Sequence, residues 1–335
     1  MNEQLTENQI NAAGHLTIGG CDAVELAHKY GTPLVVYDVS KIRDQIRRVE
    51  KVFAANHVDY AVSYASKAFA AIAMYQVAAA EGAHTDVVSG GELYTAIKAG
   101  FPMDRVSFHG NNKSREELEM AIRHHVGVVI LDNFHEIDLL ADLLEENDAQ
   151  IKVMLRITPG ISAHTNKYIQ TGQVDSKFGF DLQSGQADEA LEKVLANPRM
   201  EMLGLHPHIA SQILELAGFE AVADKLVEVA AHWQTKYGYQ AQGINVGGGF
   251  GSRYVSADHP LMPEDFVDAI IKAIKQTIAK TNLAMPAIWI EPGRSIVGPA
   301  GYNLYTVGSR KDVPGLKPYV TVDGGRGDNI RPARY

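Results

Sequence analysis

The stretch YAVSYASK, residues 60 to 67, decides how the rest of the chain is interpreted. Its alternation of apolar and small polar residues predicts a buried β-strand that ends on a lysine, Lys67. A lysine at a strand end is ordinarily a surface residue, so this stretch alone leaves a surface role and a functional role open. The other strands of the chain must decide between them.

Seven further β-rich runs follow, and helical patterns separate them. The runs are HTDVVSG ending at Gly90, RVSFHG at Gly110, VGVVILD at Asp132, KVMLRIT at Thr158, EMLGLHPH at His208, GINVGGG at Gly249 and AIWIEPG at Gly293. The intervening stretches, such as 114–125 and 263–280, have the apolar spacing of amphipathic helices. Eight βα units in succession predict an α/β fold that closes into a (β/α)8 barrel of the TIM type.

The carboxyl ends of these strands carry chemically versatile side chains. They are Lys67, Ser89, His109, Asp132, Arg156, His206, His208, Glu291 and Arg294. In a (β/α)8 barrel the active site is built at this end, because eight loops converge there on a rigid frame. The position of Lys67 on the same rim therefore favours a functional lysine.

Two segments lie outside the predicted barrel, which we place at 39–300. Residues 1–38 contain the strand-like TPLVVYDV and are expected to contribute to a second, β-rich domain. From residue 301 two more strand-like runs, YNLYTVG and PYVTVDGG, predict the start of that domain at 301–335. We expect this domain to be incomplete in the chain, because two or three strands cannot form a stable sandwich by themselves.

Composition excludes several classes of protein. The chain has 335 residues, of which 46% are hydrophobic, enough for a full-sized core. A formal net charge of -9 argues against a nucleic-acid partner, which requires clustered Lys and Arg. The single cysteine, Cys21, excludes an intrachain disulfide. A polar N-terminus without a signal-peptide pattern, and no long apolar run, predict a cytoplasmic protein without a membrane partner.

Two rim motifs suggest ligand binding. In NVGGGFGS, Gly247 to Gly249 and Gly251 can turn backbone N–H groups towards an anion such as a phosphate, although such a turn also occurs for conformational reasons alone. In WIEPGRS, the carboxylate of Glu291 at the end of a buried strand requires a partner. Arg294 is a candidate for an internal salt bridge, which is the alternative to a functional Glu291.

His206 and His208 lie two residues apart and therefore on one face of their strand. Asp132 and His109 share the rim, but no third ligand stands at a recognisable spacing, so no metal site is predicted. Stacking of an imidazole on a flat cofactor is the favoured use.

An amine, a phosphate cradle, a carboxylate and an imidazole on one rim together suit pyridoxal phosphate. The amine of Lys67 bonds to the cofactor's aldehyde, and the glycine turn holds its phosphate. A carboxylate keeps the pyridine nitrogen protonated, which makes the cofactor a strong electron acceptor. That property serves decarboxylation, whereas racemisation favours an arginine at this position.

The same motifs resemble those of the diaminopimelate decarboxylases, in the alanine racemase and ornithine decarboxylase group of fold-type III pyridoxal-phosphate enzymes. The resemblance runs from about residue 14 to the end of the chain. It rests on YASKAF, DVVSGGELYTA, HTNKYIQTGQVDSKFGF, GLHPHIASQI, GGGFG, EPGRS and VDGGRGDNIRPARY. It implies pyridoxal-phosphate-dependent decarboxylation of meso-2,6-diaminopimelate to L-lysine, the last step of bacterial lysine biosynthesis.

The resemblance also implies roles for individual residues and a homodimer with shared active sites. The catalytic residues would be Lys67, His208 and Glu291. The cofactor would be bound by Lys67, His208, Ser211, Gly248, Gly249, Glu291, Gly293 and Arg294, and the substrate by Arg294, Arg331 and Tyr335.

The sequence departs from the family pattern at Pro207, Ile209 and Ala210, next to the stacking histidine, and relatives continue beyond Tyr335. We therefore expect the C-terminal segment of the family to be missing, with weakened activity. Two alternatives remain: a related decarboxylase acting on a carboxynorspermidine- or ornithine-type amino acid, and a catalytically silent homologue that binds a cofactor or partner. Retention of Lys67, His208, Glu291 and Arg294 favours an enzyme over the silent homologue.

Overall fold

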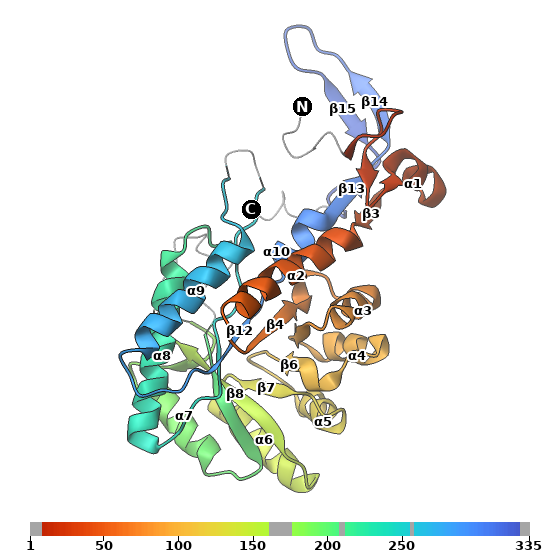
Figure 1. Cartoon of the computed structure of the whole chain (residues 1–335). Helices are drawn as coiled ribbons and strands as arrows, with labels where there is room; N and C mark the ends of the chain where they lie inside the picture. The colour runs from red at the N-terminus through yellow and green to blue at the C-terminus, as the bar shows by residue number, and fades with distance from the viewer. Residues whose placement is uncertain (1–8, 161–175, 208–211, 255–257, 329–335) are drawn as a thin grey trace. The chain divides into compact units, whose positions relative to one another are not determined.

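The computed structural model describes residues 9–160, 176–207, 212–254 and 258–328. Contacts within the chain divide it into two compact units, one formed by 43–296 and the other by 1–42 together with 297–335. Figure 1 shows the order of the elements in both units. The domain boundaries expected from the sequence stay a prediction.

The larger unit is a closed barrel of eight parallel strands. They are β4 (Tyr60–Ala65), β5 (His84–Val87), β6 (Val106–Phe108), β7 (Val128–Leu131), β8 (Ile151–Thr158), β10 (Met200–His206), β11 (Gly243–Asn245) and β12 (Ala287–Ile290). Neighbours pair in this order, and β12 pairs with β4 to close the ring. The short β9 (Phe180–Asp181) extends β8 at its carboxyl end. The predicted (β/α)8 barrel is confirmed.

Helices lie outside the strands (Figure 1). Seven follow barrel strands: α3 (Ile72–Ala80), α4 (Gly90–Ala99), α5 (Arg115–Arg123), α6 (Phe134–Glu146), α7 (Gln186–Leu195), α8 (Ala217–Tyr237) and α9 (Pro263–Ile278). A further helix, α2 (Val39–Ala55), precedes β4. Several begin at polar caps, as α5 does at Ser114. The Ser114 hydroxyl accepts a hydrogen bond from the N–H of Glu117, and the Glu117 carboxylate accepts one from the N–H of Ser114.

An aromatic cluster packs behind the glycine turn. Phe250, which follows the turn, stacks on Phe266 of α9 at 5.3 Å between ring centroids, and Phe219 of α8 lies 5.1 Å from Phe250. All three side chains are fully buried. Burial of three aromatic rings fixes the turn against the helical layer.

The smaller unit contains short strands and one helix. Its elements are β1 (Thr17–Ile18), β2 (Cys21–Asp22), α1 (Ala23–Tyr30), β3 (Leu34–Tyr37), β13 (Gly301–Leu304), β14 (Val307–Lys311) and β15 (Tyr319–Val322). β3 pairs antiparallel with β13, and β14 pairs antiparallel with β15. Strand-like runs at both ends of the sequence thus form strands. The helix α10 (Arg294–Val297) leads from the barrel into this unit.

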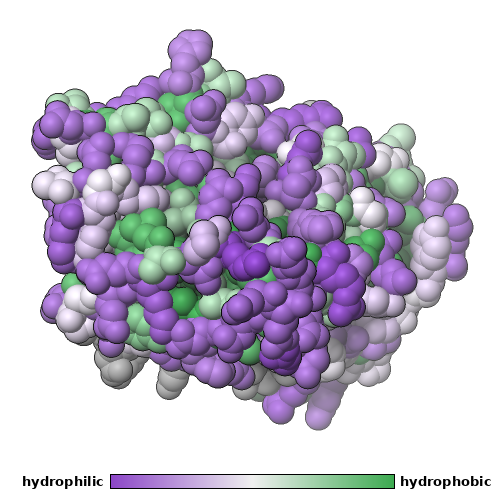
Figure 2. All heavy atoms as spheres, turned by 90° about the horizontal axis from the view of Figure 1, so that it is seen from below, coloured by the Kyte–Doolittle hydropathy of each residue, from purple (hydrophilic) through white to green (hydrophobic). Residues whose placement is uncertain are grey.

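None of the helices among the described residues has the length and apolar content needed to span a membrane. The face seen in Figure 2 is mostly hydrophilic, with apolar residues in separate small groups.

Candidate active site

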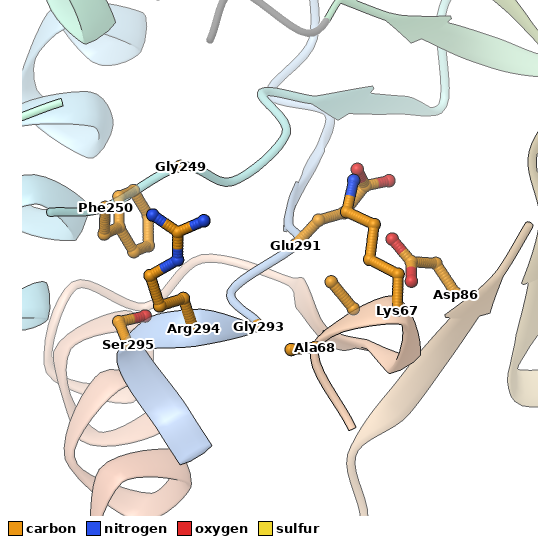
Figure 3. A pocket seen from close by; sticks show the side chains of 10 residues that line it. Lys67, Ala68, Asp86, Gly249, Phe250, Glu291, Gly293, Arg294 and Ser295 are labelled. Carbon is orange, nitrogen blue, oxygen red and sulfur yellow. The ribbon is translucent and has the colours of Figure 1, made fainter. Parts of the chain in front are cut away.

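A cavity of about 210 Å³ lies at the carboxyl ends of the barrel strands. Its lining comes from the ends of β4 and β5 and from the segments after β4, β11 and β12, and is formed by Ala65, Lys67, Ala68, Asp86, Gly249, Phe250, Glu291, Gly293, Arg294 and Ser295. Figure 3 shows Lys67, Asp86 and Glu291 on one side of this cavity and Arg294 and Phe250 on the other. The rim therefore carries a cavity, and the roles of its residues stay a prediction.

Lys67 lies on a short 3-10 turn, Ser66–Ala68, that directly follows β4. The turn is anchored from the neighbouring strand, since the backbone N–H of Ser66 donates to Asp86 Oδ1 at 3.0 Å. The lysine itself is exposed, whereas Ser66 is fully buried. An anchored turn thus presents the amine of Lys67 to the cavity.

Asp86 is 2% exposed and is the acidic neighbour of Lys67. Burial raises the pKa of Asp86 well above its usual range, and the nearby Glu291 raises it further, while Lys67 and the Ser66 N–H act in the opposite direction. Asp86 therefore favours the protonated form more than an exposed aspartate does.

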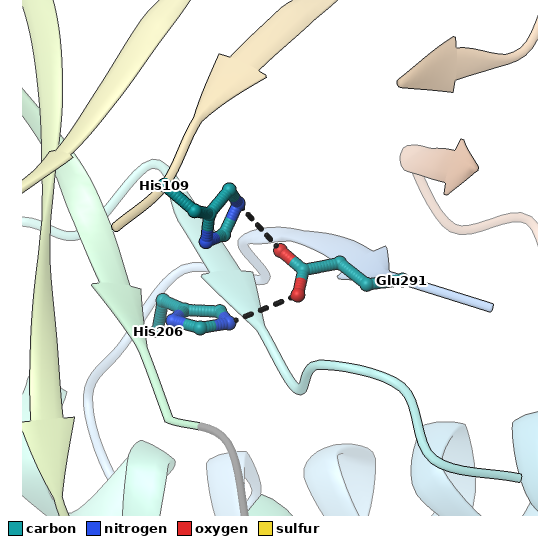
Figure 4. A group of neighbouring side chains, drawn as sticks. All are labelled: His109, His206 and Glu291. Carbon is teal, nitrogen blue, oxygen red and sulfur yellow. Dashed lines mark hydrogen bonds and ion pairs between the residues drawn. The ribbon is translucent and has the colours of Figure 1, made fainter. Parts of the chain in front are cut away.

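Glu291, directly after β12, has three side-chain nitrogen atoms close to its carboxylate. Its Oε1 lies 3.1 Å from His109 Nε2 and accepts from Asn245 Nδ2 at 2.7 Å. Its Oε2 lies 3.1 Å from His206 Nε2. Figure 4 shows both imidazoles directed at the two carboxylate oxygens. Burial acts to raise the pKa of Glu291, but His109 and His206 outweigh it and hold that pKa well below the usual range.

His109 differs from a surface histidine in its protonation. Burial lowers the pKa of His109 to about 4, although the adjacent Glu291 favours the charged form. At neutral pH the ring is therefore neutral, and its Nε2 lies 3.1 Å from Glu291 Oε1 without forming a hydrogen bond of acceptable geometry. The His109 and His206 rings meet edge to face, with centroids 4.9 Å apart.

His109, His206 and Glu291 are close enough together to hold a metal ion, because their ligand atoms lie within 4.8 Å of one another. The sequence reasoning did not identify Glu291 as the third group. A ligating histidine normally has its second ring nitrogen bonded to a carboxylate or carbonyl. His206 Nδ1 is buried with no partner among the described residues, so the cluster lacks that support. The absence of a metal stays a prediction.

The glycine turn has a backbone that only glycine adopts readily. Gly247 and Gly249 have φ of 74° and 97°. A Cβ built on Gly248 would lie 1.9 Å from the carbonyl oxygen of Glu291. The conformational explanation for the glycines is thus sufficient for Gly247 and Gly248. Gly249 also lines the cavity, so the glycine turn forms part of the cavity wall.

Gln212 connects the turn to Arg294. Arg294 Nη1 donates to Gln212 Oε1 at 3.3 Å, and its guanidinium lies 5.7 Å from the centroid of the Tyr254 ring. Gln212 has a left-handed φ of 60°, uncommon for a residue with a side chain. Arg294 is therefore held by Gln212, while the described side chains in contact with the Glu291 carboxylate are His109, His206 and Asn245.

The structure brings together five of the predicted site residues along the cavity: Lys67, Gly249, Glu291, Gly293 and Arg294. Gly248 lies beside them, buried in the turn. The other four, His208, Ser211, Arg331 and Tyr335, lie outside the described residues.

Sequence reasoning missed Asp86, Asn245 and Gln212. A signal existed for both Asp86 and Asn245, since each is a polar residue in a predicted strand, HTDVV and GINVG, close to the carboxyl end. Gln212 has no such signal, because its role depends on the fold of the loop after β10.

The cavity suits pyridoxal phosphate by the chemistry of its groups. Lys67 provides an amine for an aldehyde, and the glycine turn lies at the opposite side. A carboxylate accepts about four hydrogen bonds. Among the described residues, Glu291 is hydrogen-bonded to His206 and Asn245, which leaves acceptor capacity for a protonated ring nitrogen.

Comparison with known proteins identifies related chains. The family model described as "Pyridoxal-dependent decarboxylase, pyridoxal binding domain" matches residues 39–298. Diaminopimelate decarboxylase from Bacillus subtilis is 54% identical over 97% of this chain and 74% of its own length. The enzyme of that name from Halalkalibacterium halodurans is 53% identical over 98% of this chain and 75% of its own.

Solved structures agree with this result. A crystal structure of diaminopimelate decarboxylase from M. jannaschii, in co-complex with L-lysine, superposes with a TM-score of 0.89 at 34% identity. The match covers 97% of this chain and 75% of that one. The chain therefore spans about three quarters of the length of these relatives.

Proposed function

Because the chain belongs to the pyridoxal-dependent decarboxylases, we propose that its cavity binds pyridoxal 5'-phosphate and that it decarboxylates meso-2,6-diaminopimelate to L-lysine and CO2. The observation that carries this proposal is the 54% identity to the Bacillus subtilis diaminopimelate decarboxylase across nearly the whole chain. The cavity supports it, because Lys67 and Glu291 line the same space.

Lys67 would hold the cofactor through its amine, which suits the cofactor's aldehyde. Its position supports this role, since it is exposed on an anchored turn at the cavity. Bound pyridoxal phosphate supplies an electron acceptor for the electron pair left on the α-carbon when CO2 departs. A proton then takes the place of the lost carboxylate.

Glu291 holds the proton on the ring nitrogen of the cofactor. A carboxylate can do this only while it is ionised, and the low pKa of Glu291 meets that condition at neutral pH. Glu291→Gln removes the charge but keeps the shape. We expect cofactor attachment to persist and the rate to fall on the order of 10²-fold, as for removal of one electrostatic contact.

The remaining predicted residues bind the ends of the two ligands. Gly248, Gly249, Gly293 and Ser211 hold the cofactor's phosphate, and His208 stacks on its ring. Arg294, with Arg331 and Tyr335, binds the substrate's distal carboxylate, for which a guanidinium provides two parallel donors. The position of Arg294 on the cavity supports its part in this.

We further propose that the protein acts in the cytoplasm as a homodimer with shared active sites, without a nucleic-acid partner. Resemblance to the family supports the dimer, and the net charge of -9 speaks against nucleic acid. Analytical ultracentrifugation and cell fractionation test these points. A monodisperse monomer with full activity would contradict the shared site.

A substrate comparison tests the proposed function. The purified protein with pyridoxal phosphate is incubated separately with meso-diaminopimelate, ornithine and carboxynorspermidine, and both CO2 and the amine product are quantified. We expect L-lysine from the first and little product from the others. Preference for ornithine or carboxynorspermidine would make the chain a related decarboxylase, and no CO2 from any substrate would make it a silent homologue.

A further inference from the structure

Asn245 belongs to the site but has no role in the function described so far. It is the last residue of β11 and is fully buried. Its Oδ1 accepts from the backbone N–H of Gly247 at 2.9 Å, and its Nδ2 donates to Glu291 Oε1 at 2.7 Å. One amide side chain therefore connects the first residue of the glycine turn to the carboxylate of Glu291.

The orientation of the Asn245 amide follows from its partners. A backbone N–H can only donate, so the atom beside Gly247 is the oxygen Oδ1, and the atom beside Glu291 is the nitrogen Nδ2. Leucine and aspartate have nearly the same shape as asparagine. Leucine offers neither a donor nor an acceptor, and an ionised aspartate offers acceptors alone. Among side chains of this size, asparagine supplies both the acceptor and the permanent donor that these contacts require.

Backbone hydrogen bonds run beside the amide. The N–H of Glu291 donates to the carbonyl of Gly247 at 2.8 Å, and the N–H of Val246 donates to the carbonyl of Trp289 at 2.9 Å. The pairing of β11 with β12 thus continues past the last strand residues. Gly247 and Glu291 are linked twice, through their main chains and through the side chain of Asn245.

We propose that Asn245 is a positioning residue that couples the two ends of the cofactor site: it holds the Glu291 carboxylate and the glycine turn at a fixed spacing. This inference rests on the proposed function, in which Glu291 serves the ring nitrogen of pyridoxal phosphate and the glycine turn serves its phosphate. Glu291 and Gly249 of the turn line the same cavity (Figure 3).

The physical reason is the rigidity of the ligand. The aromatic ring of pyridoxal phosphate fixes the distance between its nitrogen and the carbon that bears the phosphate arm. Both contacts therefore form together only if the protein presents its two groups at matching positions. A glutamate side chain has several rotamers, and ordering it only when the ligand binds would weaken the affinity. The hydrogen bond from Asn245 orders the Glu291 carboxylate beforehand.

The burial of Asn245 supports this role. Its sequence neighbours, Ile244 and Val246, are buried and apolar, so the amide lies in an apolar part of the barrel. Burial of an amide is unfavourable unless its polar atoms are hydrogen-bonded. Among the described residues, Asn245 is the one side chain that bonds to both Glu291 and Gly247. Its polar atoms are thus used at the site itself.

The first test measures both ends of the connection in the cofactor-free protein. NMR follows the exchange rate of the Gly247 amide proton and the ¹³C signal of the Glu291 carboxyl carbon, which Glu291→Gln assigns. Asn245→Leu removes both bonds, whereas Asn245→Asp keeps an acceptor for Gly247 but no permanent donor for Glu291. Asn56→Asp is the matched control, because Asn56 is a half-buried asparagine whose amide donates to the carbonyl of Val52 at the end of α2.

We expect the Gly247 amide proton to exchange at least about tenfold faster in Asn245→Leu and at an unchanged rate in Asn245→Asp and Asn56→Asp. The Glu291 signal shifts in both Asn245 variants and stays in place in Asn56→Asp. Unchanged exchange in Asn245→Leu, or an unchanged Glu291 signal in both Asn245 variants, would overturn the proposal. If Asn245→Leu does not fold, Asn245→Ala takes its place, since a methyl group also offers no donor or acceptor, and the same changes are required.

Ligand analogues measure the coupling itself. Fluorescence titration gives the Kd of pyridoxal phosphate, of pyridoxal, which lacks the phosphate, and of 1-deazapyridoxal phosphate, in which a carbon replaces the ring nitrogen. The ratio of the Kd of pyridoxal to that of pyridoxal phosphate reports the phosphate contact. The corresponding ratio for the deaza analogue reports the ring-nitrogen contact. A general loss of folded protein leaves both ratios unchanged, because it weakens the three ligands by the same factor.

We expect both ratios to fall about tenfold in Asn245→Leu. In Glu291→Gln, which keeps an acceptor for Asn245, we expect only the ring-nitrogen ratio to fall. A Leu variant in which neither ratio falls, or only one of them, would contradict the coupling. If the unchanged chain fails to bind pyridoxal phosphate, the proposed function fails, whereas the NMR comparison still decides whether Asn245 connects Glu291 to the glycine turn.

Discussion

Gln212 and Ser252 exchange two hydrogen bonds beside the glycine turn. The backbone N–H of Ser252 donates to Gln212 Oε1 at 3.2 Å, and Gln212 Nε2 donates to the carbonyl of Ser252. The same Oε1 accepts from Arg294. One amide side chain therefore joins the loop after β10, the end of the glycine turn and the predicted substrate arginine.

This relationship predicts that the Gln212 side chain supports cofactor binding. Gln212→Gly removes the three hydrogen bonds while its φ of 60° stays accessible, so backbone strain is not introduced. We expect the Kd of pyridoxal phosphate to rise about tenfold, because the turn and Arg294 lose their common anchor. Gln240→Ala, which removes a half-buried glutamine away from the cavity, is the control and leaves the Kd unchanged.

Gly248 provides a test of the strand-end packing. A Cβ at this position would meet the Glu291 carbonyl oxygen at 1.9 Å, so Gly248→Ala must push the ends of β11 and β12 apart. We expect the free energy of unfolding to fall by about 1–3 kcal/mol in urea denaturation. Gly327→Ala, where a Cβ meets nothing within 4 Å, serves as control. Equal stability of the two variants contradicts the packing argument.

The buried pair Lys113 and Glu136 gives a stability prediction. Lys113→Met leaves Glu136 charged and without its cation in the interior, and we expect a loss of about 3–5 kcal/mol of unfolding free energy. The double variant Lys113→Met with Glu136→Leu removes both charges and should recover most of that loss. A double variant as unstable as the single one would show that the ion pair is not the cause.

The barrel was predictable because its signals are local and repeated. Each of the eight strands is followed by polar or glycine residues at its carboxyl end. All the strands predicted from 60–67 to 287–293 are present. The amphipathic helices α2 and α7 were not singled out. Strand identity depends on short-range alternation, which a single sequence displays.

The site was only partly predictable because its contacts are not local. Lys67 and Glu291 were found from their strand ends, but the pairing of Glu291 with His109 and Asn245 arises from closure of the ring of strands. Arg294 was considered as the partner of Glu291 because the two are close in sequence. The barrel instead directs Arg294 to Gln212, a residue distant in sequence.

The buried His109 also predicts a pH dependence of stability. Its pKa falls from 6.5 to about 4 on folding, so between these values the unfolded chain binds a proton that the folded protein does not. The unfolding free energy therefore decreases as pH falls from 6.5 to 4 and is restored above 6.5. Asp86 changes the unfolding free energy with pH in the opposite direction, because folding raises its pKa. Asp86 is present in both proteins compared below, so its contribution is common to them.

Urea denaturation of the unchanged chain and of His109→Gln over this pH range isolates the contribution of His109. We expect the unfolding free energy of the Gln variant to decrease less steeply as the pH falls. The difference in slope corresponds to at most one proton, the one that His109 binds only in the unfolded chain. Parallel curves for the two proteins would mean that His109 titrates as an exposed histidine does.

Borohydride reduction followed by peptide mapping tests the central claim most directly. The protein is loaded with pyridoxal phosphate, reduced, digested and analysed by mass spectrometry for the peptide that carries the cofactor. The account predicts a single modified lysine, Lys67, and no modification of that peptide in Lys67→Arg. Cofactor on another lysine, or on none after loading is shown by absorbance, would contradict the assignment of this cavity as the active site.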